Sequence, residues 1–237
     1  MFVIKMRKFF IILVLILTIL TGTICFTAIN RTSSQATVKK YKIVLDAGHG
    51  GIDGGVVGKT TGVKESELNL SIVKKLEDYC VNAGFSVVLT RKTQAGLYGL
   101  ATSNLKRKDM QARKEIILKE RPDLVVSVHL NKFSLSSRRG AQVFYREDNE
   151  QSKILAQSIQ NSFNNMEEAP RQSSPLKGDY YLLNCSNYPS VIAECGFLSN
   201  PEDEKLLVTD DYQGKVAYAI FKGIVEYLSQ NILGHNH

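Results

Sequence analysis

Short apolar runs alternate with stretches of helical periodicity along most of this chain. In the predicted helix at 65–80, Leu68, Ile72, Leu76 and Tyr79 fall on one face at spacings of four, four and three residues. Strands are predicted at 43–45, 85–89, 124–128, 142–145, 180–183 and 190–193, and further helices at 105–120, 152–163 and 212–228. This alternation predicts a single α/β domain with a mixed, mostly parallel sheet of about six strands, flanked by helices on both faces.

The first 40 residues have a different pattern from the rest. Residues 1–8 are basic, and residues 9–29 form a stretch of 21 residues without a charge. This length spans a bilayer, and the preceding charges place residues 1–8 in the cytoplasm. A retained transmembrane anchor is favoured over a cleaved signal peptide because Phe26 interrupts the small-residue cleavage pattern before Ala28.

The predicted anchor at residues 9–29 is followed by three further segments. Residues 30–40 are polar and are expected to form a tether, 41–230 the catalytic domain, and 231–237 a flexible tail. We therefore expect the domain to work outside the cytoplasm, either anchored on the outer face of the cytoplasmic membrane or secreted.

The charge balance argues against a nucleic-acid partner. The chain carries a formal net charge of +7, but its first 40 residues hold six basic and no acidic residues, which leaves 24 basic against 23 acidic residues beyond them. The surplus therefore reflects membrane topology. Three cysteines remain in the body, at 80, 185 and 195, and this odd number without paired spacing predicts buried thiols and no disulfide framework.

Two histidines stand at equivalent places in the predicted sheet. His49 lies in a glycine-rich turn after the strand at 43–45, and His129 follows the strand at 124–128. His235 and His237 belong to the predicted tail. Because the carboxyl ends of parallel strands share one edge, where ligands bind, His49 and His129 are expected to converge there.

Two carboxylates can complete a metal site. Glu65 lies in the first turn of the helix after the glycine-rich loop, where an acid is also favoured by the helix dipole alone. Its neighbour Glu67 points about 200° around the helix. Glu194 ends the apolar strand at 190–193, a costly place for a carboxylate unless it is paired with a cation or catalytic. Zinc hydrolases use three such ligands, leave the fourth position for water, and need a base that is not itself a ligand.

Over about residues 41–230 the chain resembles the zinc-dependent N-acetylmuramoyl-L-alanine amidases of the type-3 group. The matching segments, in order, are Asp46-Ala47-Gly48-His49-Gly50-Gly51, Glu65-Ser66-Glu67-Leu68-Asn69-Leu70, Ser127-Val128-His129-Leu130-Asn131 and Glu194-Cys195-Gly196-Phe197-Leu198-Ser199-Asn200. The resemblance implies that His49, Glu65 and His129 bind Zn²⁺ and that Glu194 is the catalytic glutamate. The reaction it implies is hydrolysis of the amide between the lactyl group of N-acetylmuramic acid and L-alanine in peptidoglycan.

The chain differs from the family at some positions and is similar to one subgroup of it. Ser66 and Ile116-Ile117-Leu118 replace a lysine and an alanine-asparagine pair that are frequent in the family, which bears on substrate fit. A short anchor with a bare catalytic domain is similar to the germination-specific amidases of endospore formers, which prepare muramic-δ-lactam in spore cortex. Because the three ligands come from separate segments, a regulatory protein partner that orders the loops is a further hypothesis.

Three other functions remain open. A cysteine hydrolase using Cys195 and His129 would leave His49 without a role and requires a lowered thiol pKa. A non-catalytic, membrane-tethered peptidoglycan-binding protein would not need all four site residues. A dinucleotide site at 48–53 is disfavoured because the third glycine is missing and Asp53 would repel a pyrophosphate.

Overall fold

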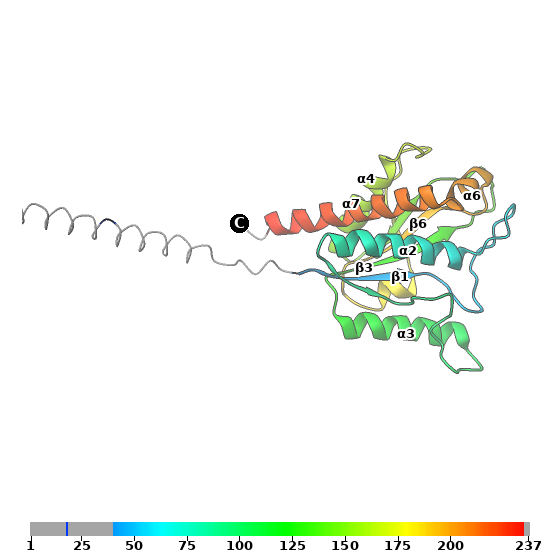
Figure 1. Ribbon diagram of the computed structural model, residues 1–237, viewed down its shortest axis with the longest axis horizontal. Coiled ribbons are helices and arrows are strands. Elements are labelled where there is room, and N and C mark those ends of the chain that lie inside the picture. Colours follow the sequence, from blue (N-terminus) through cyan, green and yellow to red (C-terminus); the bar gives the residue numbers. More distant parts are fainter. Residues whose placement is uncertain (1–17, 19–39, 235–237) are drawn as a thin grey trace, which may run out of the picture. The chain divides into compact units, whose positions relative to one another are not determined.

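The computed structural model describes residue 18 and residues 40–234, and the account below is limited to them. Residues 40–234 form alternating strands and helices (Figure 1). The strands are β1 (Lys42–Ala47), β2 (Ser86–Leu89), β3 (Leu124–Asn131), β4 (Gln142–Tyr145), β5 (Leu176–Lys177) and β6 (Ser190–Phe197). The helices are α2 (Glu65–Asn82), α3 (Leu105–Glu120), α4 (Glu150–Asn164), α5 (Tyr181–Asn184), α6 (Pro201–Leu207) and α7 (Asp210–Gly234).

The six strands form one sheet in the order β2-β1-β3-β6-β4-β5. β1 pairs in parallel with β2 and with β3, and β3 pairs in parallel with β6. β4 runs antiparallel to β6 and pairs in parallel with β5. The prediction of a mixed, mostly parallel sheet in a single α/β domain is confirmed, and the parallel strands bring their carboxyl ends to one edge.

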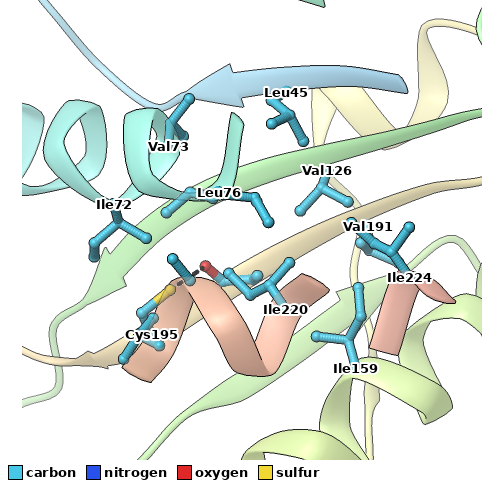
Figure 2. Packing of buried hydrophobic residues seen from close by; sticks show 14 of the residues in the cluster. Leu45, Ile72, Val73, Leu76, Val126, Ile159, Val191, Cys195, Ile220 and Ile224 are labelled. Carbon is cyan, nitrogen blue, oxygen red and sulfur yellow. Dashed lines mark hydrogen bonds between the residues drawn. The ribbon is translucent and has the colours of Figure 1, made fainter. Parts of the chain in front are cut away.

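Helices cover both faces of the sheet. α2, α4 and α7 lie on one face and α3 lies on the other (Figure 1). Alternation along β1 explains the two layers: Leu45 faces the core under α2 and α7, whereas Val44 joins a smaller cluster with Ile117 of α3. Figure 2 shows the larger core, in which Leu76 of α2 and Ile220 of α7 pack against residues of the strands.

Some predicted elements were wrong or too short. The segment 180–183, predicted as a strand, forms the short helix α5, in which the Asn184 amide donates to the Tyr180 carbonyl oxygen at 3.1 Å. A four-residue apolar run does not distinguish the two structures by its periodicity. The strands predicted at 124–128 and 190–193 continue to Asn131 and Phe197, so His129 and Glu194 lie within strands.

Part of the predicted organisation falls on residues that the structure does not describe. The basic segment 1–8, the candidate anchor 9–29 and the tether 30–40 lie outside them, apart from Thr18 and Lys40. At the other end α7 continues to Gly234, into the predicted tail. None of the helices formed by the described residues combines the length and apolar composition needed to cross a membrane.

Candidate functional site

The turn after β1 places His49 at the carboxyl edge of the sheet. His49 has a positive φ of 60°, which non-glycine residues rarely adopt. The Gly48 amide donates to the Val128 carbonyl oxygen at 3.0 Å, which ties the turn to β3. A Cβ at Gly48 would lie 2.3 Å from the His129 ring, and one at Gly55 would lie 2.4 Å from Glu65 Oε2. These two positions require glycine because the side chains of His129 and Glu65 occupy the space.

His49, Glu65 and His129 form a cluster whose ligand atoms all lie within 4.8 Å of one another. Glu65 Oε1 lies 3.2 Å from His49 Nε2 and 3.0 Å from His129 Nδ1. Tetrahedral ligands at about 2.0–2.1 Å from a zinc ion are about 3.3 Å apart, close to these separations. Two imidazoles and one carboxylate are also the donor types of a catalytic zinc site, so the residues present fit this metal.

Glu65 is held by the backbone as well as by the histidines. Its Oε1 accepts hydrogen bonds from Leu130 N at 3.1 Å and Asn69 Nδ2 at 3.2 Å, and its Oε2 accepts one from Val56 N at 2.9 Å. Its exposed fraction is 1%, whereas Glu67 is exposed, as its helical position predicted. A favourable helix dipole alone does not explain a carboxylate so deeply embedded.

The charges in this cluster are coupled. Burial alone would raise the pKa of Glu65, but hydrogen bonds with His129 and His49 outweigh it and hold that pKa well below its usual range. Burial would lower the pKa of His49, but contacts with Glu65 and Asp53 raise it instead. The carboxylate form of Glu65, which metal binding requires, is therefore favoured by the fold itself.

Glu194 lies beside this cluster without joining it. It is the register partner of His129 on the adjacent strand, and its Oε2 atom is buried with no hydrogen-bond partner among the described residues. Burial, reinforced by the charge of Glu65, raises the pKa of Glu194 to about 7 against the opposing effect of His129 and His49. No lysine or arginine within residues 40–234 forms an ion pair with it, so the alternative of a structural partner finds no support there.

A cleft of about 900 Å³ contains all four predicted site residues. Its other walls come from the loop before α3, from α3 itself, from the end of β3 and from the start of α5; they include Tyr98, Lys106, Met110, Lys132, Tyr180 and Tyr181. This volume accommodates a ligand much larger than a metal ion and a water molecule.

Sequence reasoning missed two buried arginines that donate hydrogen bonds to the turn carrying His49. Arg113 donates to Asp46, to the Ala47 carbonyl oxygen at 2.8 Å and to the His49 carbonyl oxygen at 2.6 Å. Arg91 donates to the Ala47 and Gly48 carbonyl oxygens at 2.8 and 2.9 Å. Two signals could have identified them: Arg91 lies two residues after the end of β2, and Arg113 shares the buried face of α3 with Ile117.

The cysteine alternative is contradicted by the direction of Cys195. Successive residues of β6 face opposite sides of the sheet, so Glu194 faces the cleft and Cys195 lies in the core under α2 and α7 (Figure 2). Cys195 is fully buried, and burial raises the pKa of its thiol well above the usual range. The predicted buried state also holds for Cys80, whereas Cys185 is half-buried.

The comparisons with known proteins agree with the geometry. A family profile described as N-acetylmuramoyl-L-alanine amidase matches residues 43–226. The germination-specific N-acetylmuramoyl-L-alanine amidase of Bacillus subtilis (strain 168) is 34% identical over 192 residues, which cover 79% of this chain and 80% of that protein.

Solved structures give the same result. The CwlD amidase from Clostridioides difficile, in complex with the GerS lipoprotein, is similar with a TM-score of 0.77 and 40% identity over 80% of this chain and 99% of that one. An N-acetylmuramoyl-L-alanine amidase from Clostridium difficile 630 has a TM-score of 0.71 and 30% identity over 80% of this chain and 97% of that one.

These matches confirm the resemblance inferred from the four sequence motifs, and with it the prediction that the chain is an amidase acting on peptidoglycan. The non-catalytic alternative is not supported, because the four predicted site residues share one cleft. The chain belongs to the N-acetylmuramoyl-L-alanine amidase family.

Proposed function

We propose that this chain is a zinc-dependent amidase in which His49, Glu65 and His129 hold the metal and Glu194 acts as general base and acid. The bond cleaved is the amide between the lactyl group of N-acetylmuramic acid and L-alanine. One observation carries this proposal: a three-residue ligand cluster lies in the same cleft as the carboxyl group of Glu194, whose buried Oε2 atom has no hydrogen-bond partner among residues 40–234.

The chemistry divides between the metal and the side chains. A bound Zn²⁺ supplies a Lewis acid that lowers the pKa of water toward about 7 and polarises the scissile carbonyl. Glu194 accepts the proton of the attacking water and delivers it to the departing alanine nitrogen, which must be protonated to leave. In the metal-free protein burial raises the pKa of Glu194 to about 7, and a bound Zn²⁺ would lower it again and favour the carboxylate, the form that accepts the proton.

The surrounding residues hold this geometry before substrate arrives. Asn69 and the amides of Val56 and Leu130 fix the Glu65 carboxylate, while Arg91 and Arg113 fix the carbonyl groups of the turn that carries His49. Such preorganisation lowers the cost of arranging charged groups during the reaction.

The biological setting we propose is the spore cortex, where removal of stem peptides prepares muramic-δ-lactam. Support comes from the 34% identity to the germination-specific amidase of Bacillus subtilis and from the similarity to the Clostridioides difficile CwlD amidase. Spores that carry only the Glu194→Gln form should then contain cortex without muramic-δ-lactam. Normal lactam content in those spores would contradict this setting.

We also propose attachment to the membrane through residues 9–29 and a protein partner. The apolar composition of this segment supports the former. For the latter, the CwlD amidase from Clostridioides difficile is known in complex with the GerS lipoprotein. A partner that orders the site should raise the zinc affinity of the purified chain when it is added; an unchanged affinity would contradict this role.

The proposed chemistry is tested on purified protein and peptidoglycan. Removal of metal with a chelator should abolish the release of new alanine amino termini, and one equivalent of Zn²⁺ should restore it. A thiol-blocking reagent should leave the rate unchanged because Cys195 does not face the cleft. Activity that survives complete metal removal would contradict the proposal.

A further inference from the structure

His49 contacts a different carboxylate through each of its ring nitrogens. Its Nε2 atom lies 3.2 Å from Glu65 Oε1, inside the ligand cluster, and its Nδ1 atom lies 3.0 Å from Asp53 Oδ2, outside it. A neutral imidazole carries one N–H group, and only the other nitrogen has a lone pair for a metal. The group that accepts from Nδ1 therefore decides which nitrogen is available to the cluster.

Asp53 is itself fixed in place. The backbones of Gly50 and Asp53 bond to each other, with N···O distances of 2.8 and 3.2 Å, and Asp53 Oδ1 accepts from the Gly55 amide at 3.1 Å. Lys106 Nζ lies 3.6 Å from Asp53 Oδ2. The aspartate thus presents one oxygen to Gly55 and the other to His49, with a cation on its solvent side.

The backbone conformation at His49 makes the contact between Nδ1 and Asp53 important for the direction of the ring. The residue lies in a turn with a positive φ, beyond the last residue of β1, so regular strand geometry does not set the direction of its ring. The ring touches His129 edge to face, at a centroid distance of 5.0 Å, and each of its two nitrogens contacts a carboxylate.

We propose that Asp53 is a positioning residue that keeps the proton of His49 on Nδ1 and thereby directs Nε2 toward the metal. A carboxylate behind a metal-binding histidine fixes the tautomer and the ring orientation and raises the basicity of the ligand. This inference rests on the proposed zinc site, and it adds a residue that is neither one of the three ligands nor Glu194.

Asp53→Asn is the sharpest variant because it is nearly isosteric. Its single side-chain oxygen can still accept from Gly55, which leaves an NH₂ group facing His49 Nδ1. Two donors then oppose each other, and the tautomer with the proton on Nε2, which cannot bind the metal, is favoured. Asp53→Ala removes both contacts and serves as the second variant.

The measurement is the dissociation constant of Zn²⁺ from the full-length protein by competition with a chelator, well below the unfolding temperature of each metal-free form. Both variants should bind Zn²⁺ about 10–100-fold more weakly. Asp211→Asn, at an exposed aspartate in the first turn of α7, should bind as the native chain does. In the zinc-loaded native protein, the nitrogen NMR signals of His49 should show a protonated Nδ1 and a metal-bound Nε2.

Two results would overturn the inference. One is native zinc affinity in both Asp53 variants, and the other is a metal-bound Nδ1 in the native protein. Failure of the proposed function looks different, because the native chain itself would then bind no Zn²⁺ at this cluster, and the inference would fall with it.

Discussion

His129 on β3 and Glu194 on β6 are direct register partners on adjacent parallel strands. This pairing places a proposed metal ligand and a proposed base side by side, and both residues lie on strands of the sheet. Residues on strands of a central sheet are held more rigidly than residues on loops, so the separation of the two groups is set by the fold. The other two ligands are brought to this pair by the turn after β1 and by the start of α2.

The ionisation of Glu194 should destabilise the metal-free protein at neutral and alkaline pH. Its pKa is about 7 in the folded chain and near 4.5 in the unfolded one, so the folded state binds more protons between these values and stability falls as pH rises through them. Glu194→Gln should therefore raise the free energy of unfolding at pH 8 by about 1–3 kcal/mol.

Denaturant unfolding at several pH values, in the presence of a chelator, checks this prediction. Below about pH 4 the variant and the native chain should converge, because the carboxyl group is then protonated in both states. Saturating Zn²⁺ should shrink the difference at pH 8, since a nearby cation favours the ionised form. A variant less stable than the native chain at pH 8 would contradict the burial argument.

Replacement of a ligand histidine should remove the metal without unfolding the domain. His49→Ala and His129→Ala should each reduce bound zinc to a small fraction of an equivalent, because two remaining ligands hold the ion poorly. Elemental analysis of the purified variants measures this directly. His235→Ala, outside the proposed ligand set, is the control; full zinc content in either site variant would rule out that histidine as a ligand.

Glycine at position 48 is required by the His129 ring. In Gly48→Ala the new Cβ would lie 2.3–2.6 Å from three ring atoms, so the ring must move and zinc affinity should fall at least tenfold. Gly214→Ala is a matched control, because a Cβ there meets nothing within 4 Å and alanine is the better helix former. Chelator competition on both variants provides the comparison, and native affinity in Gly48→Ala would show that the ring adapts.

The buried guanidinium of Arg113 should matter for stability as well as for the site. Arg113→Met would leave Asp46 and Asp109 charged and buried and would remove donors from the carbonyl groups of Ala47 and His49. The expected cost is about 3–5 kcal/mol in the free energy of unfolding.

Arg107→Met, at an exposed position on the same helix, is the control and should change stability by less than about 0.5 kcal/mol. Urea unfolding of the two variants checks the difference. Equal stabilities would show that the network around Arg113 contributes nothing to the fold.

The convergence of the four candidate site residues could be predicted because their positions follow from strand topology. Two histidines after apolar strands, and a carboxylate at the end of a third, must meet at the carboxyl edge of a parallel sheet. The structure places His49, His129 and Glu194 there, together with Glu65 at the start of α2.

The residues that were missed depend on contacts that no local pattern encodes. Arg91 and Arg113 each donate to two backbone carbonyl groups of a turn more than 40 residues away in the sequence. Asp53 contacts His49 across a turn with positive φ angles. The strand predicted at 180–183 was wrong because a short apolar run fits a helix equally well; Leu182 and Leu183 are both buried in α5.

The central claim is that Glu194 performs proton transfer while three other residues hold the metal. The most direct measurement combines zinc content and the rate of amide hydrolysis in purified Glu194→Gln protein. We expect about one equivalent of zinc under conditions that load the native chain, with a rate at least about 100-fold lower. A Glu194→Gln protein that holds zinc and cleaves peptidoglycan at the native rate would contradict this account.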